Sequence, residues 1–291
     1  MAERMAAWFQ NLLPGLFVLL WSTGFIGTKL GLADAEPFTF LLLRFSATCL
    51  LLLGIVLALR RPWPVDAKHA GHIMIAGVLL QGGYLGGVFS AIHLGLPAGL
   101  TALIVGMQPL LTGLFSARML GERVGMRQWS GLVLGFAGVA LVLSGRFSLS
   151  GFSLLGFGFA LLALASITFG TLYQKRFCGQ MDLWSGSLLQ FAASAVVVMP
   201  LALTFETMQV NWEGSFLFAL GWLVLVLSVG AVSLLHLLIR RGAATRVATL
   251  FYLTPPTTAL MAWAMFGERL AMPAVAGMAL AVAGVAIALK R

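Results

Sequence analysis

The residues of this chain that could do chemistry are aromatic rings, amides, hydroxyls and imidazoles set within long apolar runs. The candidates for contact with a small molecule are Trp21, Phe25, Gln81, Tyr84, Gln108, Thr168, His236, Tyr252 and Trp263. Aromatic rings contact apolar groups, whereas amides and hydroxyls bind an ammonium and a carboxylate. The set therefore fits a site for a zwitterion with an apolar side chain. For any single member, packing within the core explains the residue equally well.

Helical spacing strengthens part of this set. Trp21 and Phe25 are four residues apart, and Gln81 and Tyr84 are three apart, so each pair falls on one face of a helix. An amide in an apolar environment needs a partner. Gln81, Tyr84 and Gln108 are therefore the strongest individual candidates.

Three prolines mark points where the helices should be interrupted. Pro109, Pro255 and Pro256 lie inside apolar runs, and a proline cannot donate to the carbonyl four residues earlier. Interrupted helices often lie at the binding sites of transport proteins. We expect these prolines to act as hinges or to free carbonyls for a ligand. Satisfaction of those carbonyls by water or threonine side chains is an equally open alternative.

The composition identifies the elements that must position these residues. Hydrophobic residues make up 60% of the 291 positions, charged residues only 9%, and the mean hydropathy is +1.00. Soluble domains carry about 25% charged residues. The apolar runs are continuous rather than alternating, which favours helices over a membrane barrel. The chain is predicted to be an all-α polytopic membrane protein, and its net charge of +9 indicates topology rather than nucleic-acid binding.

Charge, proline and glycine divide the chain into ten apolar segments, each long enough to span a bilayer. The predicted segments are 12–31, 38–59, 72–94, 98–117, 127–144, 152–173, 184–204, 215–239, 246–266 and 272–289. With a cytoplasmic N-terminus, fourteen of the 18 Lys and Arg residues fall in inner loops or ends and only Arg146 and Arg269 fall outside. This asymmetry predicts that both termini are cytoplasmic.

The second half of the chain repeats the first at an offset of 146 residues. Gly121-Glu122-Arg123 recurs as Gly267-Glu268-Arg269, and Pro109 recurs as Pro255. Five helices per half is an odd number, so the second half should be inverted in the membrane. We expect two five-helix repeats, at 1–145 and 146–291. Inverted halves can expose a shared site to either side in turn, which is alternating access.

The positions of the acidic residues bear on ion-coupled transport and on catalysis. All nine map to loops or helix ends, whereas proton- and sodium-coupled carriers commonly need a carboxylate within the membrane. The sequence also has no HExxH zinc motif, no buried aspartate pair and no Ser/His dyad. We expect no enzyme, no metal, no cofactor and no strict proton coupling. Arg44 is expected to reach outward or to pair with Asp34 or Glu36, and direct contact with the substrate is the less favoured alternative.

These features resemble those of the drug/metabolite transporter superfamily, and of its EamA-type branch in particular. The resemblance rests on the proline-containing fourth and ninth segments, on the Gly-Glu pairs at 121–122 and 267–268, and on Trp21-Ser22-Thr23-Gly24-Phe25. It extends over nearly the whole chain. It implies ten helices in two halves and, together with the aromatic-rich helices, export of amino acids across a bacterial inner membrane.

Several alternatives stay open at this stage. A broad exporter of nucleosides or cationic compounds is the main one, and a channel is another. The expected partners are a small-molecule substrate and the lipid bilayer, with no nucleic acid. Two complete halves on one chain favour a monomer.

Overall fold

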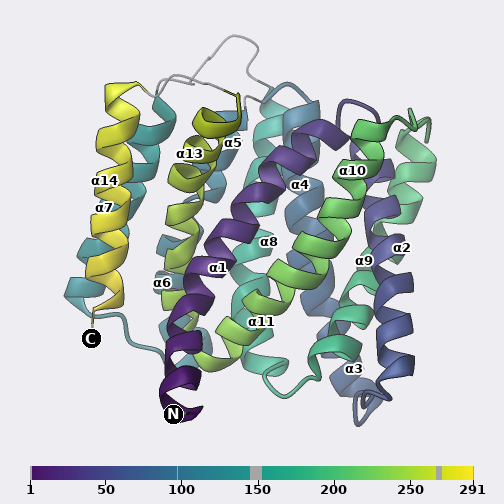
Figure 1. The fold of residues 1–291 in the computed structure, drawn as a ribbon, viewed down its shortest axis with the longest axis horizontal. Coiled ribbons are helices and arrows are strands. Elements are labelled where there is room, and N and C mark those ends of the chain that lie inside the picture. Colours follow the sequence, from purple (N-terminus) through teal and green to yellow (C-terminus); the bar gives the residue numbers. More distant parts are fainter. Residues whose placement is uncertain (1, 97, 145–152, 267–270, 291) are drawn as a thin grey trace.

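The computed structural model describes residues 2–96, 98–144, 153–266 and 271–290, and these form a bundle of helices (Figure 1). Most helices run nearly along one direction, and α1 crosses the front of the bundle at an angle. The start of α1 and the end of α14 lie at the same end of the bundle. An even number of crossings would produce this arrangement.

The helical elements follow one another with short connections. Their bounds are α1 Ala2–Gly31, α2 Pro37–Ala58, α3 Ala67–Gly77, η1 Val78–Gly83, α4 Tyr84–His93, α5 Ala98–Val105, α6 Gln108–Leu120, α7 Met126–Ser144, α8 Leu154–Phe177, α9 Leu183–Phe205, α10 Gly214–Trp222, η2 Leu223–Ala231, α11 Val232–Arg241, α12 Ala244–Thr249, η3 Leu250–Leu253, α13 Thr254–Phe266 and α14 Met272–Leu289. Within the described ranges the chain is helical apart from connections and one isolated β-bridge, between Ala35 and Val210.

Eight helical spans among the described residues are long and apolar enough to cross a membrane. The all-α membrane class is therefore confirmed. The two remaining segments are α1, whose apolar stretch Leu12–Gly24 is shorter, and the interrupted run α12–η3–α13. The count of ten stays a prediction. The repeat residues Gly267, Glu268 and Arg269, together with Arg146 and the boundary at 145/146, lie outside the described residues.

Four of the long helical runs change their geometry part-way. The segments η1 and η2 are π-helical, and the turn at Gly106–Met107 and the 3₁₀ segment η3 immediately precede Pro109 and Pro255. The segments η1 and η2 are about 146 residues apart, which is the offset of the repeat, and the Gly106–Met107 turn and η3 are separated by a similar distance along the chain. π-Helical turns are wider than α-helical turns and are frequent at functional sites. These interruptions are therefore candidate positions for a functional site.

Helices α7 and α14 make the closest long contact in the bundle. Gly138 faces the backbone of Gly277 and Ala281, and Gly131 faces the backbone of Gly284 and Ala288. A Cβ added at Gly138 or Gly284 would collide with backbone of the other helix. The helices approach so closely because glycine removes the side chain at each crossing point.

Helices α2 and α9 form a second pair, held at its middle by aromatic rings. The ring centroids of Phe45 and Phe191 are 5.7 Å apart, and both rings are fully buried. These two residues are themselves 146 positions apart. Phe40, which stacks near Phe89 and Phe216, extends the same apolar core.

Candidate functional site

An aromatic cluster joins the first helix to the break that precedes α13. The ring centroid of Trp21 lies 5.3 Å from that of Phe17 and 5.3 Å from that of Phe251. Trp21 and Phe251 meet edge to face, which is a favourable arrangement for aromatic rings. Trp21 is only partly buried. The cluster is thus not fully enclosed by the rest of the bundle.

Tyr84 lies next to the cluster, directly after the π-helical segment η1. It is 6% exposed and packs with Leu80, Ile167 and Trp21. The same packing group includes Phe251. Two sequence candidates from different helices, Trp21 and Tyr84, are therefore brought together.

Arg44 is the residue that the sequence expectation placed wrongly. Its side chain neither reaches the surface nor pairs with an acid: it is 5% exposed, and its Nε donates to the Ser228 hydroxyl at 3.0 Å. Asp34 and Glu36 bind Asn211 and Thr207 instead. The reason is geometric, because α2 turns Arg44 toward η2 and the bundle interior.

Several other candidates are buried polar groups with unused hydrogen-bonding capacity. Gln108 is 1% exposed at the start of α6, and neither its amide oxygen nor its amide nitrogen has a partner among the described residues. The same is true of the hydroxyls of Thr168 and Tyr252, both fully buried. Gln81 is buried within η1. Such groups are normally paired or hydrated in native proteins.

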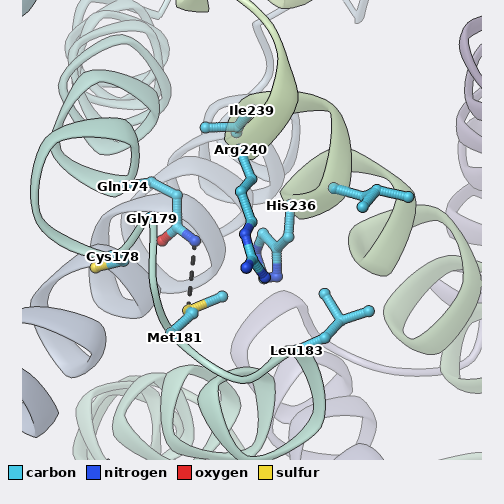
Figure 2. Close-up of a pocket in the computed structure, with 9 residues that line it drawn as sticks. Gln174, Cys178, Gly179, Met181, Leu183, His236, Ile239 and Arg240 are labelled. Carbon is cyan, nitrogen blue, oxygen red and sulfur yellow. Dashed lines mark hydrogen bonds between the residues drawn. The ribbon is translucent and has the colours of Figure 1, made fainter.

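A second polar cluster surrounds His236 on α11. The His236 ring lies 3.3 Å from the Ser187 hydroxyl, and the Gln190 amide donates to that of Gln174 at 2.6 Å. A small cavity of about 60 Å³ adjoins this cluster and is lined by Gln174, Met181, His236 and Arg240 among others (Figure 2). The volume suits a few water molecules rather than an amino acid.

The remaining sequence candidates are Trp263, Phe25 and the three prolines. Trp263 is 55% exposed and is not brought together with the rest. The side chain of Phe25 lies outside the described residues. Pro109 stands in the first turn of α6, and Pro255 and Pro256 stand in the first turn of α13, so each follows a break. Among the described residues, no three His, Cys, Asp or Glu side chains are grouped to hold a metal.

At one end of the bundle, carboxylates join the loop before α2 to the loop after α9. Glu206 accepts hydrogen bonds from the Phe38 and Thr39 backbone N–H groups at 2.7 and 2.6 Å, and from the Thr39 hydroxyl. Glu36 accepts from the N–H and hydroxyl of Thr207, both at 2.7 Å. The Thr207 hydroxyl is the largest cause that holds the pKa of Glu36 below its ordinary value. We call these contacts the acidic clasp.

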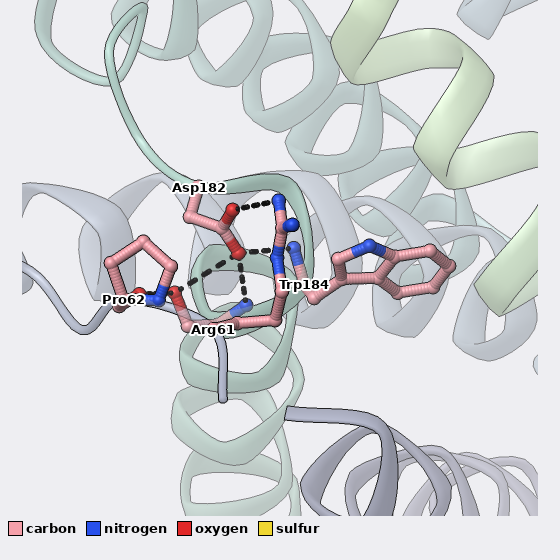
Figure 3. A network of polar contacts seen from close by, with 5 residues as sticks. Arg61, Pro62, Asp182 and Trp184 are labelled. Carbon is pink, nitrogen blue, oxygen red and sulfur yellow. Dashed lines mark hydrogen bonds and ion pairs between the residues drawn. The ribbon is translucent and has the colours of Figure 1, made fainter. Parts of the chain in front are cut away.

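At the other end, an ion pair joins the same two helices. Arg61 Nη2 lies 2.6 Å from an Asp182 oxygen, and the Ser185 hydroxyl donates to the Pro62 carbonyl (Figure 3). Burial acts to raise the pKa of Asp182. The hydrogen bonds from Arg61 and from the backbone N–H groups of Ser185 and Trp184 outweigh burial, and the pKa is lowered. We call these contacts the basic clasp.

More contacts tie the basic end together. Lys175 donates to the carbonyls of Ile239 and Gly242, and Glu122 accepts from the Ala244 N–H. The connections 59–66, 121–125, 178–182 and 242–243 thus lie at one end, where most of the described Lys and Arg residues gather. The cations and the acidic clasp mark opposite ends of the bundle.

Eight apolar spans, a set of polar side chains buried in the interior, and a charge bias between the two ends define a polytopic helical membrane protein. The EamA-like transporter family model matches residues 11–144 and again residues 154–290. The chain belongs to this family.

Several characterised and uncharacterised transporters are similar to this chain over long stretches. Transporter YvbV of Bacillus subtilis is 29% identical over 95% of this chain and 90% of its own length. A probable amino-acid metabolite efflux pump of Escherichia coli is 24% identical over 90% of this chain and 88% of its own. The aromatic amino acid exporter YddG of Ancylobacter novellus is 33% identical over about half of each chain, 49% and 46%.

Sequence reasoning considered Arg44 and Ser228 separately but did not predict that they bond to each other, and it did not select Phe251. One signal could have found Arg44: it is a charge two turns inside an otherwise apolar helix, with no acid at helical spacing beside it. Phe251 carried no comparable signal, because one aromatic residue in an apolar run looks like any other core residue.

Proposed function

We propose that this protein is a secondary transporter that exports amino acids, or similar small metabolites, across the bacterial inner membrane by alternating access. The observation that carries the proposal is a set of interior contacts between polar and aromatic residues of the two halves. Trp21, Arg44 and Tyr84 come from the first half, and Ser228 and Phe251 come from the second. A site at the junction of two halves is where relative movement of the halves can change its access.

Inverted repeats at 1–145 and 146–291 are part of this proposal. The family model matches the chain twice, once in each half. The residues that touch across α7–α14 are related by the same offset, since Gly131 corresponds to Gly277 and Gly138 to Gly284. Phe45 and Phe191, another related pair, touch each other. A pseudo-two-fold axis between the halves accounts for these contacts.

The charges support amino-acid export without strict proton coupling. Every described acid lies at a helix end or in a loop, where the clasps or the solvent stabilise it. By their names, the probable efflux pump moves an amino-acid metabolite and YddG moves aromatic amino acids. The cytoplasmic location of both termini, the monomeric state and the hinge role of Pro109, Pro255 and Pro256 belong to the same proposal.

The test is transport by the purified protein in liposomes. Uptake of labelled Thr, Met, Phe and Trp, compared with a cationic dye and a nucleoside, should be saturable and should show counterflow. Transport of an amino acid without a pH gradient is the expected result. Movement of the dye or nucleoside alone would favour the broad exporter, and flux without saturation or counterflow would favour a channel. Strict dependence on a pH gradient would contradict uncoupled export, and His236→Ala would then be the first variant to make.

A further inference from the structure

Arg44 is a buried charge that no acidic residue of the described chain balances. Its side chain is 5% exposed, and its single hydrogen bond to another side chain is the one from Nε to Ser228. The ion pair formed by Arg61 and Asp182 is the only one found among the described residues. A buried cation without a counter-ion is unfavourable by several kcal/mol. Its retention in this position needs an explanation.

The nearby acids are engaged elsewhere. Glu36 and Glu206 accept hydrogen bonds within the acidic clasp, and Asp34 accepts from Asn211. Their carboxylates belong to the loops that precede α2 and follow α9, whereas Arg44 lies about two turns into α2. Among the described residues, no acid forms an ion pair or a hydrogen bond with Arg44.

The surroundings of Arg44 suit a small molecule with a carboxylate and an apolar group. Guanidinium presents its donors in a planar fork that matches a carboxylate, and the Ser228 bond occupies only the Nε side. Trp21 packs against the core that contains Phe45 and Leu227, the chain neighbours of Arg44 and Ser228, and also against the group that contains Tyr84 and Phe251. The charge, the hydroxyl and the rings thus lie in adjoining parts of the bundle interior.

The charge also breaks the symmetry of the two halves. The residue that the repeat makes equivalent to Arg44 is Gln190, which bonds Gln174 in the second polar cluster. Because only one of the two equivalent positions carries a cation, we expect the chain to bind one anionic group there. An uncharged amide in the equivalent place needs no counter-ion.

We propose that Arg44 binds the carboxylate of the transported substrate, with the substrate's apolar group against Trp21 and Phe251. The proposal rests on the proposed amino-acid transport and adds its recognition chemistry. It requires an anionic group on the substrate and excludes compounds that carry only a positive charge. Ser228 is a positioning residue that orients the guanidinium.

The experiment compares each transported amino acid with its own amide, which has the same side chain but no carboxylate. In liposomes, the wild type should favour the acid in kcat/KM by roughly 10- to 100-fold, the range for hydrogen bonds to a charged group. Arg44→Gln should bring acid and amide to within about twofold. Arg44→Lys should keep part of the preference. Arg241→Gln, which removes the same charge from an exposed helix end, should change nothing.

Two further measurements distinguish a role of Arg44 in substrate binding from a role in holding α2 against η2. Ser228→Ala removes the bond that orients the guanidinium but leaves the charge, so the acid preference should be reduced but not abolished. Without substrate, Arg44→Met should be at least as thermally stable as the wild type, because an unbalanced charge has been replaced by an apolar chain of similar length. Added amino acid should raise the Tm of the wild type but not that of Arg44→Met.

The outcomes are distinguishable. If Arg44→Gln keeps the wild-type preference for acid over amide, the carboxylate proposal is wrong while amino-acid transport stands. The proposal is equally wrong if Ser228→Ala abolishes the preference as fully as Arg44→Gln does. If the wild type moves none of the four amino acids, the proposed function itself is overturned, and the role of Arg44 falls with it.

Discussion

Two helix pairs of this protein differ in how closely their residues match between the two halves of the internal repeat. In α7–α14 the contacting residues are glycines in both halves, at Gly131 and Gly138 and at their counterparts Gly277 and Gly284. In α2–α9 the central phenylalanines are preserved, but the polar residues around them differ between halves. The pairs that differ are Arg44 and Gln190, Glu36 and Asp182, and Arg61 and Thr207. The comparison indicates that α7–α14 is a packing element, whereas α2–α9 carries the charges that distinguish one side of the protein from the other.

The largest effect should come from the glycine pair. Gly284→Ala places a Cβ against backbone atoms of Gly135 on α7, and neither backbone can yield without separating the helices. We expect a loss of about 3 kcal/mol in unfolding free energy, at the upper end for overpacking. Unfolding in detergent measures it. Gly54→Ala is the control, since a Cβ there meets nothing within 4 Å. Equal stability of both variants would remove the packing role of α7–α14.

The acidic clasp should come next. Glu206→Ala removes the acceptor of three hydrogen bonds at the start of α2, where Glu36 makes no cap of its own. We expect a loss of about 2 kcal/mol, because hydrogen bonds to a charged group contribute 1.5–3 kcal/mol. Glu206→Gln keeps one oxygen acceptor and should lose less. The same unfolding assay applies, and a stability as high as that of the wild type would show that the clasp does not hold α2.

The basic clasp should contribute less, and it should depend on salt. The Arg61 side chain is 39% exposed, so screening limits the ion pair to at most about 1 kcal/mol in a double-mutant cycle of Arg61→Ala and Asp182→Ala. Asp182→Ala alone should cost more than Arg61→Ala, since Asp182 also accepts from the Trp184 and Ser185 N–H groups that begin α9. The coupling energy should fall in high salt, whereas the effect of Glu206→Ala should change little. The reverse pattern would show that the two clasps do not differ in chemistry.

The smallest effect should be the response to acid. The pKa values of Glu36 and Asp182 are both lowered in the folded protein, so their stabilisation is complete above the ordinary values of 4.5 and 3.8 and is lost as pH falls through the lowered values. The Tm should therefore fall as pH decreases below about 4. Asp182→Asn should show a shallower decline than the wild type. An identical decline would mean that Asp182 is not part of the acid response.

The membrane class and the positions of the helical segments could be predicted from the sequence, because continuous apolar runs and interrupting charges are local signals. The same local signals placed Pro109 and Pro255 at breaks. The direction of the Arg44 side chain could not be predicted. It depends on which face of α2 meets η2, and the two segments are 184 residues apart at the contact.

The candidate site could be predicted only in part, because it too depends on contacts between helices that are distant in the sequence. Trp21 and Tyr84 were both candidates, and the structure packs them together. Trp263 was chosen on residue type alone, and it is exposed because the neighbouring helices do not cover that part of α13. His236 was chosen as a titratable group, and it lies in a separate cluster near the basic end. Residue type predicts a capacity for binding, whereas packing between distant helices decides which residues meet.

The inverted arrangement of the two halves is the claim on which alternating access depends, and it can be tested by labelling from one side of the membrane. Both native cysteines, Cys49 and Cys178, are free and can be replaced by serine. Arg123→Cys and Arg269→Cys, made singly in that background, are then exposed to a membrane-impermeant maleimide in intact cells and in inverted vesicles. We expect the probe to reach position 123 only in inverted vesicles and position 269 only in intact cells. Reaction of both positions from the same side would contradict the account.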